Sequence, residues 1–207
     1  MSYLIEVVDL KNLPPAETVL SQREQAFYQT LKLPKRRTEW FGVRLALKKL
    51  LSARTGKALP DFTLLAKERI GKPMITVGEK EFSIPFSLTH SNGYAVAAIA
   101  PDAKYIGIDL EKIAPRINAW KTDFFHPSEL TQESDEFLTS LWTQKEALVK
   151  LLGSGLTVNS FDVRTVNGTP VFLGRALEIY TALGSPKITL EKLDLLPGFC
   201  FSVAVGK

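Results

Sequence analysis

The segment from Glu136 to Gly153, EFLTSLWTQKEALVKLLG, is the most strongly patterned part of the sequence and the best guide to its fold. Its apolar residues recur every three or four positions, which is typical of one face of an α-helix, and a glycine commonly follows the end of a helix. The stripe comprises Leu138, Leu141, Trp142, Leu148, Val149 and Leu152. We therefore predict an amphipathic helix over 136–152 that packs against other elements.

A second stretch, over 36–53 and followed by Gly56, has the same character. Sliding one helix over the other by 102 positions pairs Trp40 with Trp142 and also Lys48 with Lys150. The remaining elements that the patterns predict are a helix over 20–31 and strands over 81–88, 94–100, 104–110, 161–166, 187–193 and 199–205. These patterns predict an α+β fold of two similar halves, 1–103 and 104–207, each with a small, mainly antiparallel sheet against a long helix.

Composition excludes several classes of protein. The chain has 207 residues, of which 45% are hydrophobic and 23% charged, so it can bury a sizeable core. No apolar run approaches the ~20 residues of a membrane helix, and the first residues do not resemble a signal peptide, so we expect a cytoplasmic protein. A single cysteine, Cys200, excludes an internal disulfide, and with only His90 and His126 beside it the usual zinc ligand sets cannot be assembled. A metal here would be held by oxygen.

Two acidic residues lie at the end of the apolar strand predicted over 104–110, in the sequence GIDLE at 107–111. Alternate side chains of a strand share a face, so Asp109 and Glu111 point together. Two parallel carboxylates repel each other unless a cation lies between them, and Mg²⁺ takes oxygen ligands of this kind. A D-x-E pattern alone is more often an ordinary solvated strand end, so this pair needs support from other residues.

The helix over 136–152 carries charges close to its apolar stripe. Glu146 lies one turn from Trp142 and from Lys150, and an i,i+4 ion pair worth ~0.2–0.5 kcal/mol would account for Lys150. Lys145 falls within the stripe itself, where the neighbouring residues of the helix are apolar. An ammonium in such a place needs a counter-charge, so Lys145 is the residue that an ordinary surface helix explains least well.

Phosphate-binding residue types gather in the segment FSLTHS at 86–91, which follows GKP at 71–73. Hydroxyls, a histidine near a turn and a lysine held between glycine and proline are donors suited to a phosphate. The alternative is turn chemistry, in which these side chains bond their own backbone. Asn92-Gly93 is a strong hairpin signal, which favours a turn directly after this segment.

Taken in order, these clusters resemble a known family. The segments GKP, SLTHS, GIDLEK, DFFHPSE and WTQKEALVK-x-x-G-x-GL, which span 71–156, resemble the 4′-phosphopantetheinyl transferase superfamily. The resemblance is to its long, single-chain (surfactin-synthetase-activating) type, which serves fatty-acid, polyketide and non-ribosomal-peptide synthases. It implies transfer of the phosphopantetheine arm of coenzyme A to a serine of an acidic apo-acyl or peptidyl carrier protein. It also implies a monomer whose halves are related by a pseudo-twofold, with coenzyme A in the cleft between them.

The resemblance also carries over site residues by motif. Asp109, Glu111 and Glu146 match the family's magnesium-binding acids, and Glu146 is also the expected base. The motif lysines, Lys145 and Lys150, match catalytic positions, of which Lys150 would meet the pyrophosphate. The residues that match coenzyme A contacts are Lys72 and Pro73 at the adenosine end, His90 with Thr89 at the 3′-phosphate, and, more loosely, Arg44. Thr89 departs from the more frequent serine.

Two other readings stay open. The sequence pI of about 9.1 and the run Lys35-Arg36-Arg37 would suit a nucleic-acid-binding module. That reading leaves the acidic clusters unexplained, and no RNA-recognition or zinc-finger signature is present. A family member that binds coenzyme A without transferring anything is the other alternative, although every motif acid and lysine is present. We expect no nucleic-acid partner and no membrane contact.

Overall fold

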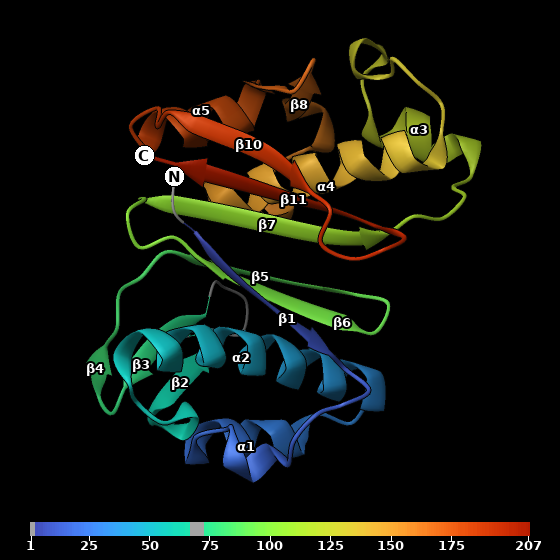
Figure 1. Ribbon diagram of the computed structural model, residues 1–207. Coiled ribbons are helices and arrows are strands. Elements are labelled where there is room, and N and C mark those ends of the chain that lie inside the picture. The colour runs from blue at the N-terminus through green and yellow to red at the C-terminus, as the bar shows by residue number, and fades with distance from the viewer. Residues whose placement is uncertain (1–2, 67–72) are drawn as a thin grey trace. The chain divides into compact units, whose positions relative to one another are not determined.

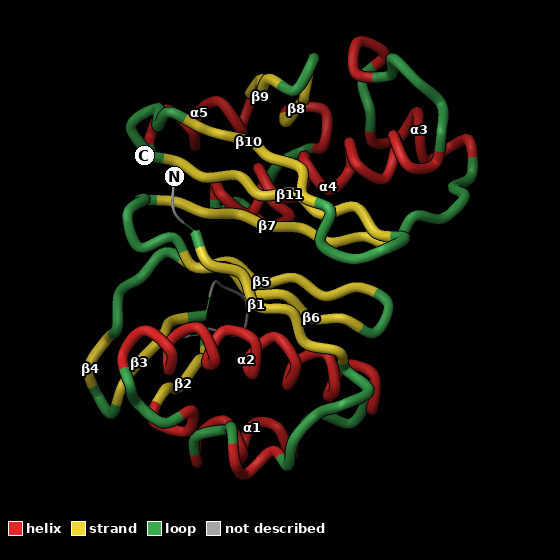
Figure 2. Tube along the Cα trace, in the orientation of Figure 1, coloured by secondary structure: helices red, strands yellow, loops and turns green. Residues whose placement is uncertain are grey.

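The computed structural model describes residues 3–66 and 73–207 (Figure 1). Contacts divide the chain into two compact units, Met1–Pro101 and Asp102–Lys207. Both units contain helices and antiparallel sheets (Figure 2), which confirms the α+β class predicted from the sequence. Within the described ranges, no helix combines the length and the apolar character that crossing a bilayer requires.

The first unit is built on a three-stranded antiparallel sheet in the order β1-β6-β5, with helix α2 packed against β1 and β6. A smaller antiparallel sheet has the order β2-β3-β4, and α1 contacts β2. The elements are β1 (Leu4–Asp9), α1 (Gln22–Thr30), α2 (Pro34–Thr55), β2 (Phe62–Leu65), β3 (Met74–Val77), β4 (Lys80–Glu81), β5 (Phe86–Ser91) and β6 (Tyr94–Ile99), with 3₁₀ turns η1 (Ala16–Thr18) and η2 (Leu59–Asp61).

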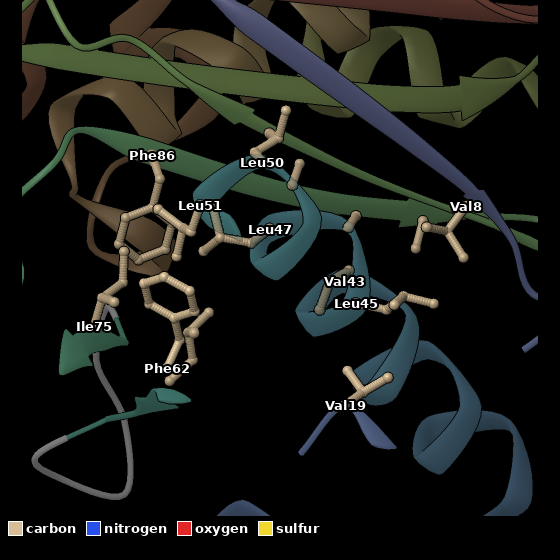
Figure 3. Close-up of a cluster of buried hydrophobic side chains, with 14 of the residues drawn as sticks. Val8, Val19, Val43, Leu45, Leu47, Leu50, Leu51, Phe62, Ile75 and Phe86 are labelled. Carbon is tan, nitrogen blue, oxygen red and sulfur yellow. The ribbon is translucent and has the colours of Figure 1, made fainter. Parts of the chain in front are cut away.

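Local signals set the bounds of the helices in this unit. Ser21 and Glu24 form a capping box that starts α1, because each side chain bonds the other residue's backbone N–H. Helix α2 begins with Pro34 and ends at Gly56, whose φ of 73° lies in the left-handed region that favours glycine. The buried face of α2 joins Phe62 and Phe86 in one apolar cluster (Figure 3).

The second unit has a three-stranded antiparallel sheet in the order β10-β11-β7, and α4 packs on β7 and β11. A two-stranded sheet, β8-β9, and helix α5 complete its core with α4. The elements are β7 (Tyr105–Lys112), α3 (Asn118–Phe124), α4 (Asp135–Leu152), β8 (Val163–Val166), β9 (Thr169–Phe172), α5 (Gly174–Ala182), β10 (Ile188–Leu193) and β11 (Phe199–Gly206), with 3₁₀ turns η3 (Pro127–Glu129), η4 (Gly155–Thr157) and η5 (Ser160–Asp162).

The two units share one internal topology. Each begins with a strand (β1 or β7) and continues through a long helix (α2 or α4) and a small antiparallel sheet. Each then ends with two strands, of which the last (β6 or β11) lies in the centre of the sheet, paired with the first strand. The two units therefore have the same internal order of strands and helices, as the sequence predicts. The pseudo-twofold between them stays a prediction.

Several predicted bounds were wrong. The strand predicted over 81–88 is interrupted, because β4 ends at Glu81 and β5 begins only at Phe86 and runs to Ser91. His90 therefore lies within a strand, while Asn92 and Gly93 form the predicted turn, both with positive φ. Before the long helix, Pro127–Glu129 form a 3₁₀ turn, and α4 begins at Asp135 after the N-cap Ser134, one residue before the predicted start. The prediction also missed β1, β2, β3, β9, α3 and α5.

Candidate functional site

Strand β7 places two of the predicted acids on one face. The strand runs through Asp109 and Glu111 to Lys112, so their side chains leave it in the same direction. Asp109 is 5% exposed, whereas Glu111 is partly exposed and lies 3.7 Å from Arg116, measured from Oε2 to Nη2. The strand therefore presents one buried carboxylate and one that solvent can reach.

Helix α4 approaches this strand closely because Gly107 has no side chain. A Cβ on Gly107 would overlap the carbonyl oxygen of Ala147 and would lie 2.5 Å from the backbone nitrogen of Leu151. Lys150, on the same helix, donates from Nζ to the carbonyl oxygen of Ile108 at 3.0 Å and to Oδ1 of Asp109 at 2.8 Å. The predicted lysine and the predicted acid are thus in direct contact.

Glu146 joins the same electrostatic environment. Burial raises the pKa of the Glu146 carboxyl, the charge of Asp109 raises this pKa further and Glu111 adds to the effect, while Lys150 opposes it. The charges of three carboxylates therefore act on one another, and among their described contacts Lys150 pairs with Asp109 and Arg116 with Glu111. The structure brings together the strand acids and the helix acid that the sequence predicts.

The donor set suits a hard divalent cation, because carboxylate oxygens are the ligands that Mg²⁺ takes and repulsion among three acids is what such a cation offsets. Over residues 3–66 and 73–207, no group of three or more His, Cys, Asp or Glu side chains is already arranged as a metal site. The fit to Mg²⁺ is thus one of chemistry and charge.

Lys145 lies in the interior and is 1% exposed. Its Nζ donates to both oxygens of Glu129, at 3.1 and 2.8 Å. Burial lowers the pKa of the Lys145 ammonium, and the bond to Glu129 opposes this. The counter-charge that Lys145 needs is therefore Glu129, the last residue of the DFFHPSE segment, for which the motifs alone indicated no role. This geometry favours an internal role for Lys145, in place of the catalytic role that the resemblance implies.

Trp142, which opens the helix motif, packs among aromatic rings of the preceding segment. Its ring centroid lies 5.6 Å from that of Trp120, 5.1 Å from Phe124 and 6.3 Å from Phe125. Aromatic pairs at such separations add packing energy beyond the area that they bury. The tryptophan therefore holds α3 and the segment after it against α4.

The predicted coenzyme A contacts belong to the first unit, and they differ in how far their side chains are exposed to solvent. His90 has a side chain 47% exposed, with Nδ1 3.7 Å from Oε1 of Glu39. Thr89 is 5% exposed, because neighbouring residues of β5 face opposite sides of the sheet. The two therefore do not present their side chains on one face. Lys72 lies outside the described residues.

Pro73 lines a pocket of about 200 Å³. The other residues that line it come from β3, from β4 and β5, and from the segment between those two strands: Met74, Ile75, Glu81, Phe82, Ser83, Ile84 and Phe86. Aromatic and aliphatic walls with a few polar groups are typical of small-molecule sites. Pro73, a predicted contact residue, thus lines a pocket, whereas its neighbour Lys72 lies outside the described residues.

Arg44 is only 7% exposed, and its contacts are internal. Its guanidinium lies 3.3 Å from the ring centroid of Trp40 and donates to the carbonyl oxygens of Trp40 and Leu64. Its Nε lies 3.7 Å from Oε1 of Glu24. Burial lowers the pKa of Arg44 to about 9, against the opposing charge of Glu24. Arg44 is therefore a core residue. Its burial and its internal contacts do not favour the expected contact with coenzyme A.

Comparison with known proteins agrees with the motifs. Residues 105–184 match the model of the 4′-phosphopantetheinyl transferase superfamily. The 4′-phosphopantetheinyl transferase gsp of Aneurinibacillus migulanus is 28% identical over 158 residues, which cover 70% of this chain and 62% of that protein. A 4′-phosphopantetheinyl transferase of Bacillus subtilis is 34% identical over 109 residues, 44% of this chain and 47% of that protein.

A solved structure of the holo-[acyl-carrier-protein] synthase of Thermotoga maritima is 27% identical, covers 60% of this chain and 74% of that chain, and gives a TM-score of 0.39. The matched part of the present chain spans about half to three fifths of the length of the two relatives named above. The matched residues 105–184 contain Asp109, Glu111, Glu146 and Lys150. In these residues the chain is similar to the 4′-phosphopantetheinyl transferase superfamily, which confirms the resemblance predicted from the motifs.

Proposed function

We propose that this protein transfers the 4′-phosphopantetheine group of coenzyme A to a serine of an apo-carrier protein in a magnesium-dependent reaction. The products are the holo-carrier protein and adenosine 3′,5′-bisphosphate. The observation that carries the proposal is that Lys150 of α4 bonds Asp109 of β7, while the charges of Asp109, Glu111 and Lys150 all act on Glu146. The similarity of residues 105–184 to the superfamily supports the reaction type.

The chemistry explains why such residue types are needed. Attack of a serine hydroxyl on the β-phosphorus of a diphosphate gathers negative charge on oxygens that are already anionic. In this proposal Asp109, Glu111 and Glu146 hold Mg²⁺, which when bound would neutralise part of that charge. Lys150 is half-buried against Asp109 and supplies a second positive charge at the same place.

Glu146 is also the proposed base for the serine proton. Its raised pKa makes it a stronger base than an ordinary carboxylate, and its position on α4 puts it beside the acids of β7. A carboxylate that also holds a cation is a poorer base, so the proton passes to Glu146 either directly or through a water molecule. Lys145 takes no part in this transfer, because its ammonium is engaged by Glu129.

The adenosine end of coenzyme A is assigned to the first unit. The pocket beside Pro73 offers Phe82 and Phe86 as apolar walls for a base. The exposed His90 is the proposed partner of the 3′-phosphate, since a protonated imidazole forms charge-assisted hydrogen bonds to phosphate. Thr89 is buried on the other face of β5 and is not retained in this role.

The test combines the purified protein, coenzyme A, Mg²⁺ and an apo-carrier protein, and follows the carrier by mass spectrometry. We expect the carrier to gain the mass of one phosphopantetheine arm. Omitting Mg²⁺ or changing Asp109→Ala should abolish the gain, whereas Glu133→Ala, in a side chain 90% exposed, should leave it intact. An undiminished gain without the metal or without Asp109 would contradict the assigned site.

A protein that binds coenzyme A without transferring anything is the second candidate. The buried, engaged positions of Lys145 and Arg44 leave fewer cations for the diphosphate than the motifs imply, which is the observation that keeps this candidate open. It predicts coenzyme A binding by calorimetry with no change in carrier mass. We further propose a cytoplasmic monomer and an acidic carrier, the latter because the chain carries a net charge of +4.

A further inference from the structure

One buried carboxylate in the second unit joins three elements. Oε2 of Glu129 accepts from the backbone N–H of His126 at 2.9 Å and from Nζ of Lys145 at 2.8 Å. Oε1 accepts from the backbone N–H of Thr165 at 2.9 Å, and again from Lys145. Glu129 thereby ties the turn η3, the helix α4 and the strand β8 to one another, in a place where it is only 2% exposed.

The first unit contains the same arrangement. Oε2 of Glu24 accepts from the backbone N–H of Ser21 and from Nζ of Lys48, and Oε1 accepts from the backbone N–H of Leu64 at 3.0 Å. Glu24 and Lys48 are both completely buried. In both units a capping turn, the long helix and the first strand of the small sheet thus meet on a single glutamate.

The position of the lysine along the helix is also the same. Lys48 lies eight positions before Gly56, and Lys145 lies eight positions before Gly153, the left-handed glycines that end α2 and α4. The 102-residue offset pairs Lys48 with Lys150 instead, so the sequence comparison did not reveal this correspondence. The two glutamate–lysine pairs are therefore structural counterparts.

The residue after the buried lysine differs between the units. After Lys48 comes Lys49, which is 47% exposed and pairs with Glu6 on β1. After Lys145 comes Glu146, the acid of the candidate site. Since successive residues of an α-helix are rotated by about 100°, anchoring the side chain of Lys145 fixes the direction in which Glu146 leaves α4.

Other contacts anchor α4 elsewhere along its length. Lys150 bonds Ile108 and Asp109 of β7, and Oγ1 of Thr143 lies 2.8 Å from Oγ of Ser202 on β11. These contacts tie the helix to the three-stranded sheet, whereas Glu129 ties it to η3 and β8. The rotation of α4 between these attachments decides where the carboxylate of Glu146 lies.

We propose that Glu129 is a positioning residue of the candidate site. Through Lys145 it sets the rotation of α4 that holds Glu146 beside Asp109 and Glu111, and Lys145 serves the site through this pair without touching the substrate. The part of the inference that concerns a cation rests on the proposed function. The part that concerns the placement of Glu146 does not.

The first unit provides the matched control for the test. In Glu129→Gln and in Glu24→Gln, an amide replaces a buried carboxylate that accepts several hydrogen bonds, so both variants lose stability for the same reason. The probe is Mn²⁺ in place of Mg²⁺, followed by electron paramagnetic resonance at a temperature at which urea titrations show each variant to be folded. We expect Glu129→Gln to weaken Mn²⁺ binding tenfold or more, and Glu24→Gln to change it less than twofold.

Equal Mn²⁺ affinity in Glu129→Gln and the wild type, or equal losses in both variants, would overturn the inference. If either glutamine variant does not fold, Glu129→Asp and Glu24→Asp replace the pair, because they keep the charge but shorten its reach. If the wild type itself binds no Mn²⁺ in a manner that depends on Asp109, the proposed function fails. The crystal structure of Glu129→Gln then decides the placement: a displaced Glu146 carboxylate supports it, and an unchanged one refutes it.

Discussion

Among single residues, Lys150 should affect Mg²⁺ binding and the transfer rate in different ways. Its ammonium neutralises Asp109, and it also competes with a cation for the same carboxylates. We expect Lys150→Met to bind Mg²⁺ as tightly as the wild type or more tightly, because one positive charge is removed from the acids. The transfer rate should fall by about 100-fold or more, because the diphosphate loses a charged partner.

The two effects are measured separately. Calorimetry gives the Mg²⁺ affinity, and the rate of carrier modification at saturating Mg²⁺ gives the transfer step. Because a cation that binds only the folded state raises stability, added Mg²⁺ should also raise the melting temperature of this variant at least as much as that of the wild type. Weaker Mg²⁺ binding in Lys150→Met would show that the lysine does not compete with the cation.

Cys200 provides a prediction about pH. This residue is partly buried on β11, with Sγ 3.5 Å from the carbonyl oxygen of Glu136. Burial raises the pKa of the Cys200 thiol from 9.0 to about 11, with a further contribution from the charge of Glu136. Since only the thiolate reacts, alkylation at pH 8 should be about 100-fold slower than for an ordinary thiol and should rise about tenfold per pH unit up to pH 11.

Iodoacetamide labelling followed by mass spectrometry measures this rate at a unique site, because the chain has one cysteine. Glu136→Gln removes one cause of the raised pKa and should speed the reaction at pH 8. A rate that is already maximal at pH 9 in the wild type would be inconsistent with the raised pKa of the thiol.

At the scale of elements, the contact between α4 and β7 depends on Gly107. A Cβ there meets backbone atoms of Ala147 and Leu151, which cannot move without displacing the helix. We expect Gly107→Ala to lower the free energy of unfolding by about 2–4 kcal/mol, as overpacking against backbone does. The displaced helix should also separate Glu146 from Asp109, so transfer should fall even in the folded fraction.

Gly42 in α2 is the matched control. A Cβ at Gly42 would meet the end of the Leu10 side chain and, at 3.0 Å, the Cβ of Ala95. The flexible leucine can move, and alanine favours a helix by up to about 1 kcal/mol over glycine, so Gly42→Ala should cost about 1 kcal/mol or less. Urea unfolding of the two variants compares them directly. Equal losses of unfolding free energy in the two variants would show that α4 and β7 pack less closely at Gly107 than the structure indicates.

At the scale of the whole molecule, the net charge of +4 favours anionic partners. Lys35, 88% exposed at the start of α2, is one of the charges that act through solvent. Raising KCl from about 50 to about 500 mM shortens the screening length severalfold, so coenzyme A binding should weaken about tenfold at constant Mg²⁺. Titration calorimetry at a series of salt concentrations measures this. A coenzyme A affinity that does not change with salt would contradict the expected contribution of exposed charges such as Lys35.

Parts of the site that depend on neighbours in the sequence were predictable. Alternation along a strand was enough to place Asp109 and Glu111 on one face, and helical spacing was enough to associate Glu146 with Lys150. The partner of Lys145 was not predictable, because Glu129 lies 16 residues earlier and reaches the lysine only through packing of η3 against α4. The bounds of β5 were also predicted wrongly, because the strand is defined by its pairing with β6 and that pairing is not visible in the local sequence pattern.

The amino-acid sequence was enough to predict the α+β class, the two long helices and the residue types of the candidate site. These follow from periodicity and from short motifs, which act over a few residues. Which charges are internal was visible only in the folded chain. Arg44, which matched a coenzyme A contact, and Lys145, which matched a catalytic lysine, are both buried. They pair with Glu24 and Glu129, because a charge that leaves water needs a partner and packing supplies one from a distant segment.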